Sequence, residues 1–120
     1  MMASTPFSVN IRNTTSMAIL DLHGEINGQA DQALAAAYTA AIARASEQGQ
    51  ASVILNFSDV YYINSTGIAL IVGLLAEARK TKRQLKVYGL SEHYMEIFHI
   101  TRLADFMQIF PDERSALQSL

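Results

Sequence analysis

The sequence predicts an α/β domain in which a mixed, mostly parallel β-sheet has helices packed on it. Short apolar runs alternate with helical patterns along most of the chain, as expected for parallel strands joined by right-handed helical crossovers. Two strand patterns open the chain with a short turn between them, which indicates a hairpin. The 120 residues are 50% hydrophobic, which suits one core. We therefore expect a single domain over residues 7–120, with the element order β-β-α-β-α-β-α-β-α.

The opening hairpin is predicted from two apolar runs. Phe7–Arg12 alternates apolar and polar residues, which is the period of a half-buried strand. Turn-forming residues follow at 13–16, and a second apolar run covers Met17–His23. Gly24 is expected to end this second strand. Residues 1–6 contain no basic segment followed by an apolar run, so we expect a flexible tail there and no secretory signal.

A helix and a buried strand are expected next. The composition turns alanine-rich from Asn27, and apolar residues recur three, four and seven positions apart, as on one face of a helix. The residues of this face are Ala30, Leu34, Ala37, Ala41 and Ala45. Gly49 is expected to end the helix. Ser52–Phe57 contains three consecutive branched apolar residues, which is typical of a strand buried on both faces.

The second half of the chain continues the alternation of helices and strands. A helix is expected over Ser65–Lys82, and its apolar stretch is much shorter than the roughly 20 residues needed to cross a bilayer. We then expect a strand over Leu85–Tyr88 and a helix over Ser91–Phe98 that Ser91 caps. A last strand is expected over Phe106–Ile109, and a final helix begins at Pro111 and Asp112.

Composition and motifs narrow the function classes. The net charge is −2 and the pI is near 5.8, so the sequence lacks the basic field that would hold a nucleic acid. The chain has no cysteine, which excludes disulfides and thiolate metal sites. Without a signal segment or a membrane span, we expect a cytoplasmic protein that does not insert into membranes.

Catalytic and cofactor motifs are also missing from the sequence. There is no G-x-S-x-G elbow for a serine nucleophile and no glycine-rich phosphate loop. His93 and His99 are six residues apart, which does not place two imidazoles on one helical face for a metal. We therefore predict a protein that is not an enzyme, with no catalytic residue, cofactor or metal.

The segment from Asp59 to Ile68 joins the buried strand to the apolar helix and contains the candidate site. Asn64 or Ser65 can cap the helix, because the N–H groups of a first helical turn lack partners. The partial positive charge there would favour a phosphate, so Ser65 is also a candidate phosphoacceptor. A role in capping alone is the alternative. Strand alternation places Tyr61 and Tyr62 on opposite faces, so one points outward if the other packs inward, and both partner contact and simple packing stay open as their role.

The helix after Ser65 has two apolar faces of different kinds. One face consists of the small residues Ala69, Gly73 and Ala76. The bulkier face consists of Ile71, Leu74, Leu75 and Ala78. An interior glycine costs about 1 kcal/mol relative to alanine in a helix. Gly73 therefore indicates that something approaches the helix closely, either the domain's own sheet or a partner. The basic residues at 79, 80, 82 and 83 suit a solvated helix end or a patch for an acidic partner.

Three separated segments carry a family signature. Asn64-Ser65-Thr66-Gly67 opens an apolar helix, Leu20–Ile26 closes a strand, and Ile100–Leu103 precedes Phe106–Phe110. Together they resemble the STAS family, in particular the bacterial anti-sigma factor antagonists, whose motif is Asp-Ser-Ser/Thr-Gly at the start of that helix. The resemblance covers most of the chain and implies the STAS fold.

The resemblance implies a switch that regulates transcription. Such a domain binds an anti-sigma factor while Ser65 is unmodified. It loses that binding when the anti-sigma factor, which is also a serine kinase and binds the ATP, phosphorylates Ser65. The partner-binding residues expected on this basis are Tyr62, Asn64, Ser65, Thr66, Gly67, Ile68, Ala69, Val72 and Gly73.

The chain departs from the family pattern at two positions. Asn64 and Asn56 stand where the family usually has aspartate. Asn64 keeps the ability to cap, but a kinase that recognises the missing carboxylate would find a poorer substrate. A second function therefore stays open, a structural STAS adaptor of a larger assembly such as a lipid-transport complex or a stress-signalling scaffold, with Ser65 as a cap only. Formation of a homodimer is open as well.

Overall fold

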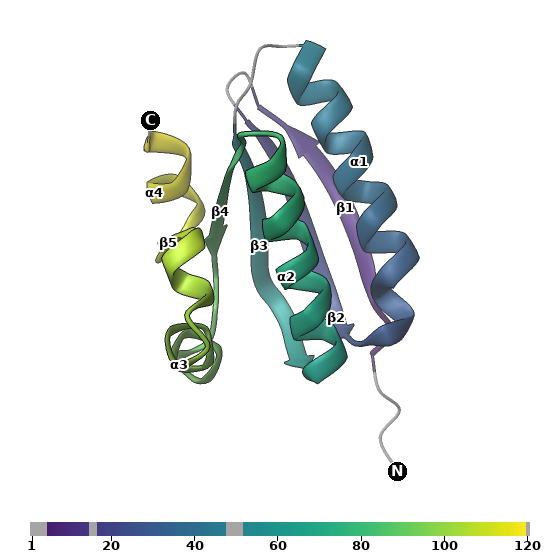
Figure 1. Ribbon diagram of the computed structural model, residues 1–120, viewed down its shortest axis with the longest axis vertical. Coiled ribbons are helices and arrows are strands. Elements are labelled where there is room, and N and C mark those ends of the chain that lie inside the picture. The colour runs from purple at the N-terminus through teal and green to yellow at the C-terminus, as the bar shows by residue number, and fades with distance from the viewer. Residues whose placement is uncertain (1–4, 15–16, 48–51, 120) are drawn as a thin grey trace.

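The computed structural model describes residues 5–14, 17–47 and 52–119 and confirms the predicted order of strands and helices (Figure 1). Two short 3₁₀ turns, η1 and η2, are additional. The elements are β1 (Ser8–Asn13), β2 (Ala18–Ile26), η1 (Gly28–Ala30), α1 (Asp31–Glu47), β3 (Ser52–Ile63), α2 (Ser65–Lys80), β4 (Gln84–Tyr88), α3 (Glu92–Ile100), η2 (Leu103–Phe106), β5 (Gln108–Phe110) and α4 (Glu113–Gln118).

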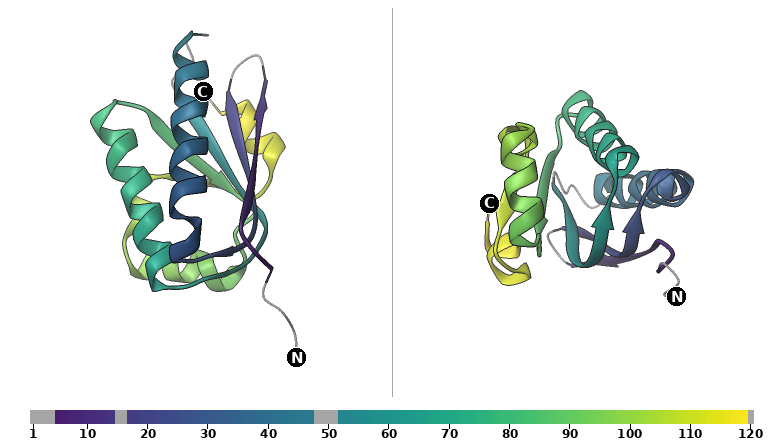
Figure 2. Two further views of the ribbon diagram at one scale, coloured as in Figure 1. Left: turned by 90° about the vertical axis from the view of Figure 1, so that its right-hand side faces the viewer. Right: turned by 90° about the horizontal axis from the view of Figure 1, so that it is seen from below.

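The sheet has five strands in the order β1-β2-β3-β4-β5. β1 pairs antiparallel with β2, and the other three pairings are parallel, which confirms the mixed, mostly parallel sheet. Helices α1 and α2 lie side by side on one face of the sheet (Figures 1 and 2). The short helix α4 packs on the opposite face. The sheet is therefore the middle layer of the domain.

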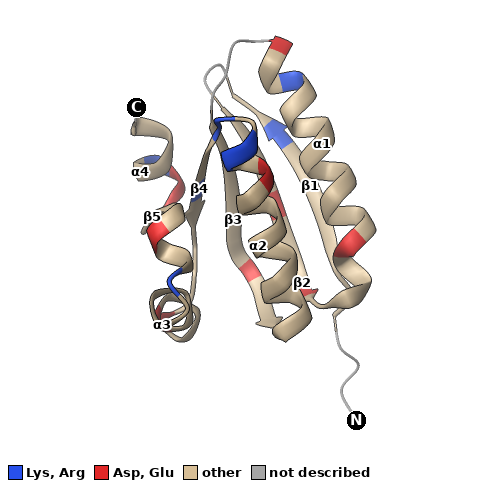
Figure 3. Cartoon of the chain, viewed as in Figure 1, with Lys and Arg blue, Asp and Glu red and all other residues tan. Residues whose placement is uncertain are grey.

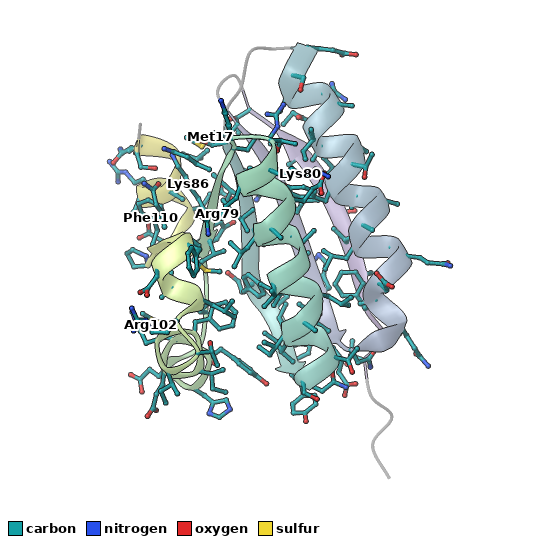
Figure 4. All side chains as sticks on the ribbon, in the orientation of Figure 1. Met17, Arg79, Lys80, Lys86, Arg102 and Phe110 are labelled. Carbon is teal, nitrogen blue, oxygen red and sulfur yellow. The ribbon has the colours of Figure 1, made fainter. Side chains whose placement is uncertain are left out.

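The hydrophobic core has two parts, one on each side of the sheet. The larger part lies between the sheet and helices α1 and α2. The residues of the predicted helical face are all buried, and Ala30, Leu34, Ala37 and Ala41 belong to this part. The smaller part lies under α4 and consists of Met17, Ile19, Ile54, Tyr88 and Ala116. Val53, Ile54 and Leu55 have no exposed surface, which confirms a strand buried on both faces. Figure 4 labels Met17, Lys86 and Phe110, which belong to the side near α4.

β2 does not end at Gly24 as expected, but continues for two more residues. Gly24 has a φ of +85°, and the register of β2 against β3 shifts between Gly24 and Glu25. This register shift marks a bulge within the strand. A Cβ at position 24 would lie 2.4 Å from a backbone oxygen of the N-terminal segment, so the close approach of that segment requires glycine. The N–H of Glu25 then donates to the carbonyl of Thr5 (3.1 Å). Residues 1–4 of the expected tail lie outside the described residues.

β3 runs six residues beyond its expected end, because β2 continues beside it. β4 ends at Tyr88, opposite Asn56, so the last part of β3 pairs with β2 alone. Tyr61 and Tyr62 lie in this protruding part and are 69% and 52% exposed. Both side chains are exposed, so neither packs inward as a core residue.

Two further boundaries differ from expectation. α2 ends at Lys80, because Lys82 adopts a left-handed conformation with a φ of 58° that cannot continue the helix. The last strand begins at Gln108 instead of Phe106, because the preceding residues form η2. The expected helix end at Gly49 lies outside the described residues.

Candidate functional site

The candidate site is the turn between β3 and α2, where β2 and β3 end together (Figure 1). The N–H of Asn64 donates to the carbonyl of Ile26 (3.2 Å) and ties the turn to the end of β2. The Asn64 Oδ1 accepts from the N–H of Gly67 (2.8 Å), so Asn64 is the helix cap. Ser65 is therefore the first residue of α2. It is exposed, and its hydroxyl makes no hydrogen bond within the part of the chain that the structure describes.

Gly67 determines how closely α2 approaches β2. It is buried, and a Cβ at this position would lie 2.0 Å from the carbonyl oxygen of Ile26 and 2.9 Å from the side chain of Ile63. No side chain fits into that gap, so the glycine allows the first helical turn to pack directly on the strand. Among the nine residues expected to bind a partner, Gly67 is buried and can only shape the surface.

The other eight predicted residues leave surface around Ser65. Two of them, Asn64 and Ile68, are half-buried. The six exposed ones are Tyr62, Ser65, Thr66, Ala69, Val72 and Gly73. Ser65, Ala69 and Val72 are spaced four and three residues apart, so they share one face of α2. Tyr62 and Val72 supply apolar area to this surface, being 52% and 45% exposed. Eight of the nine predicted residues are thus at least partly accessible, from Tyr62 at the end of β3 to Gly73 in α2.

A contact from α3 that the sequence analysis missed supports the turn. The hydroxyl of Tyr94 accepts from the N–H of Ile63 (2.8 Å) and lies 3.4 Å from the carbonyl of the same residue. α3 is held in register by Ser91, whose Oγ accepts from the N–H of Tyr94 (3.2 Å). Tyr94 is 7% exposed, so this clamp on the last residue of β3 is buried. The sequence shows a tyrosine on a predicted helix, but nothing in it indicates contact with a strand 31 residues earlier.

The electrostatic surroundings of Ser65 are free of nearby carboxylates on its own helix. The first turn of α2 contains no acidic residue, and its basic residues Arg79 and Lys80 lie in the last turn (Figures 3 and 4). Arg79 also stacks over the ring of Phe106, 4.9 Å from its centroid, and so connects α2 to η2. The positive end of the helix dipole therefore lies at Ser65, and the first turn of α2 itself carries no acidic side chain to offset it.

The structure accounts for the asparagine at position 56. Arg12 donates to both carboxylate oxygens of Asp21 (2.5 and 2.9 Å), and the Asn56 Nδ2 donates to the same carboxylate (2.8 Å). Arg12 also pairs with Glu113, which accepts from the hydroxyl of Tyr88 (2.8 Å). Burial opposes ionisation of Asp21, but the hydrogen bonds from Arg12 and Asn56 outweigh it and hold the pKa of Asp21 below its usual value. An ionised aspartate at position 56 could not donate this bond.

The structure excludes one of the two interpretations of Gly73. The bulky face of α2 is buried, and Gly73 is exposed. No atom of a described residue lies within 4 Å of the place that a Cβ of Gly73 would occupy. The domain's own sheet therefore does not approach it, and the interpretation as internal packing is wrong.

The two histidines weighed as metal ligands, His93 and His99, are both exposed. Within residues 5–14, 17–47 and 52–119, no group of three or more histidine and carboxylate side chains could hold a metal ion. Over the same ranges, no helix is long and apolar enough to cross a membrane.

Solved structures share the fold of this chain. An anti-sigma factor antagonist from Mycobacterium paratuberculosis superimposes with a TM-score of 0.78 at 19% identity, over 96% of each chain. The Bacillus cell fate determinant SpoIIAA in its phosphorylated form has a TM-score of 0.67 at 20% identity, over 93% of this chain and 96% of that one. These likenesses establish the fold.

Curated relatives and a family model agree with the structural comparison. The anti-sigma-B factor antagonist of Staphylococcus aureus is 26% identical over 102 residues, which cover 85% of this chain and 93% of that protein. The protein of the same name from Staphylococcus epidermidis is 35% identical over 63 residues, 52% of this chain and 58% of that one. The family model described as STAS domain matches residues 8–116. The chain therefore belongs to the STAS domain family.

Proposed function

We propose that this protein is an anti-sigma factor antagonist that binds an anti-sigma factor and serine kinase through the Ser65 turn and is controlled by phosphorylation of Ser65. The observation that carries the proposal is the division of roles in the turn. Asn64 caps α2, which leaves the exposed hydroxyl of Ser65 without a structural duty. A residue in that position can be modified without loss of the hydrogen bond that starts the helix.

The phosphate would change the interface and leave the fold intact. It adds a charge of about −1.5 to −2 beside the exposed apolar side chains of Ala69 and Val72. The positive end of the α2 dipole faces that charge, so the helix itself tolerates the phosphate. A partner that packs against Val72 and Tyr62 would have to desolvate the phosphate or meet it with its own charges. Binding should therefore weaken while the domain stays folded.

The aromatic residues at the end of β3 are the strongest candidates for binding energy. Tyr62 belongs to the predicted partner set, and Tyr61, which was not part of that set, is even more exposed at 69%. Tyrosines at the centre of interfaces often contribute more than 2 kcal/mol on truncation. Asn64, Thr66, Ile68 and Gly73 complete the proposed contact surface, and Gly67 shapes it from below.

The test combines phosphorylation with binding. The protein is incubated with ATP and a candidate anti-sigma kinase, and its intact mass is measured for the wild type, Ser65→Ala and the neighbouring control Thr66→Ala. We expect one phosphate on the wild type and on Thr66→Ala, and none on Ser65→Ala. Binding measured by calorimetry should be lost in Ser65→Asp and kept in Ser65→Asn, which has nearly the same shape without the charge. Equal binding of these two variants would contradict a charge-driven switch.

A second candidate function is an adaptor subunit without phosphoregulation. It is favoured by the amide of Asn64, because the first turn of α2 then offers a kinase no carboxylate. This function predicts no phosphate on Ser65 and constant co-purification with other subunits, unaffected by Ser65→Asp. Both functions keep the cytoplasmic location expected from the sequence, and only the first involves ATP, which the kinase partner would bind.

A further inference from the structure

A groove runs between α1 and α2 on the helical side of the domain. It has a volume of about 450 Å³, within the range of small-molecule sites. Its walls include Leu34, Tyr38 and Ile42 from α1, and Leu70 and Gly73 from α2. The residues of α1 that line the groove extend from Asp31, the first residue of the helix, to Ile42. At a rise of about 1.5 Å per residue, this stretch is about 16 Å long.

Small residues keep this groove open. Ala69 and Gly73 line it from α2, and both are exposed. No atom lies within 4 Å of the position that a Cβ of Gly73 would take. A bulkier residue at either position would fill space that the two helices leave empty between them. The glycine that the sequence analysis singled out is therefore part of the wall of the groove.

A buried hydroxyl at this groove lacks a partner. Tyr38 lines the groove and is 2% exposed, and its hydroxyl makes no hydrogen bond with any described residue. Burial raises the pKa of Tyr38, so the group is a neutral hydroxyl that can both donate and accept. A buried hydroxyl without a partner is costly, and such groups usually meet a polar atom. This hydroxyl is the second observation, besides the space itself, that points to a ligand.

The charged side chains that line the groove disfavour a ligand with an anionic head group. Asp31 and Glu77 line it, and no lysine or arginine among the described residues does. Arg83, whose charge also acts on Tyr38, donates to Ser46 and lines a different groove. An anionic head group would meet two carboxylates and no cation of the lining, while a neutral one could bond with the hydroxyl of Tyr38.

We infer that the groove between α1 and α2 binds an elongated aliphatic molecule with a neutral, hydrogen-bonding head group, such as an alcohol or an amide. The aliphatic part lies along the apolar walls, and the head group bonds with the hydroxyl of Tyr38. The inference stands apart from the proposed function, although Ala69 and Gly73 belong to both surfaces. A ligand in the groove would therefore alter the surface offered to a protein partner.

The test uses the isolated full-length protein and 1-octanol, with octanoate as a probe of equal chain length and opposite head-group chemistry. Binding is followed by two-dimensional amide NMR during titration below the micelle concentration of octanoate. We expect saturable shifts of amides lining the groove with octanol, and at least tenfold weaker binding of octanoate. Octanoate that binds as tightly as octanol would overturn the head-group assignment, and absence of saturable shifts with octanol would overturn the site.

Three variants localise the binding. Gly73→Leu places a bulky side chain in the groove and should abolish binding, whereas Ala76→Leu, on the exposed side of the same helix outside the groove, should bind as the wild type does. Tyr38→Phe removes the hydroxyl alone and should weaken octanol binding about fivefold. Thermal unfolding first checks that each variant is folded. Unchanged affinity in both Gly73→Leu and Tyr38→Phe would refute the assignment, and since no protein partner is present, the result is independent of the proposed switch.

Discussion

Replacement of glycine by alanine is expected to have opposite effects on stability at two positions of α2. At Gly67, a Cβ would lie 2.0 Å from the backbone oxygen of Ile26 and 2.8 Å from its carbonyl carbon. Backbone atoms of a central strand cannot give way as the end of a flexible side chain can, so Gly67→Ala must push α2 away from β2. At Gly73, a Cβ meets nothing within 4 Å. Gly73→Ala therefore adds only the better helix propensity of alanine.

The magnitudes follow from these contacts. Forcing a methyl group into a packed site costs typically 1 to 3 kcal/mol, and the rigid strand backbone places Gly67→Ala at the upper end, about 3 kcal/mol. Gly73→Ala should stabilise the fold by about 0.5 to 1 kcal/mol. For 120 residues, 1 kcal/mol corresponds to about 4 °C in Tm. We thus expect Tm to fall by about 12 °C for Gly67→Ala and to rise by about 2 to 4 °C for Gly73→Ala.

Urea unfolding followed by circular dichroism, together with thermal scans, measures both changes in one helix. The slope of the unfolding free energy with urea should be the same for the two variants and the wild type, because the surface exposed on unfolding hardly changes. Wild-type stability of Gly67→Ala would show that α2 does not lie on β2 as closely as the structure has it. A loss of stability in Gly73→Ala would show that this position is covered, and would also remove the empty groove.

The remaining predictions concern the cap and the pH dependence of stability. Asn64→Ala should lower the unfolding free energy by about 1 kcal/mol, because it removes the hydrogen bond to the first turn of α2. Ser65→Ala should change the unfolding free energy by less than about 0.5 kcal/mol. Equal losses for the two variants in urea unfolding would contradict the assigned roles. The pKa values of Asp21 and Glu113 are lowered in the fold, so their contribution is present above the unfolded pKa values near 4 and is lost as the pH falls through the folded ones. Arg12→Ala should therefore lower stability at pH 7 by about 1 kcal/mol, a value reduced for the 45% exposure of Arg12, and should flatten the pH dependence below about pH 4. An unchanged acid profile would show that Arg12 does not govern these carboxylates.

The fold of this chain was predictable because its elements differ in period and length. The alternating residues at the N-terminus and the alanine-rich stripe have the periods of a strand and of a helix, and the run Val53-Ile54-Leu55 is short and rich in β-branched residues, which favours a strand. Strand ends were less predictable. Gly24 looks like a strand terminator, but the contact with the N-terminal segment and the continued pairing with β3 turn it into a bulge, and neither contact is visible locally.

For the candidate site, the sequence by itself determined the helix start and the serine beside it, since a cap residue before an apolar helix is a local pattern. Only the tertiary structure decided which residue caps, because both Asn64 and Ser65 have a suitable oxygen and the choice depends on the bond from Asn64 to the end of β2. The structure alone also decided what surrounds the turn. Tyr94 clamps the end of β3, and Gly73 faces an open groove, because these relations join elements that are distant in the chain and depend on how the helices lie on the sheet.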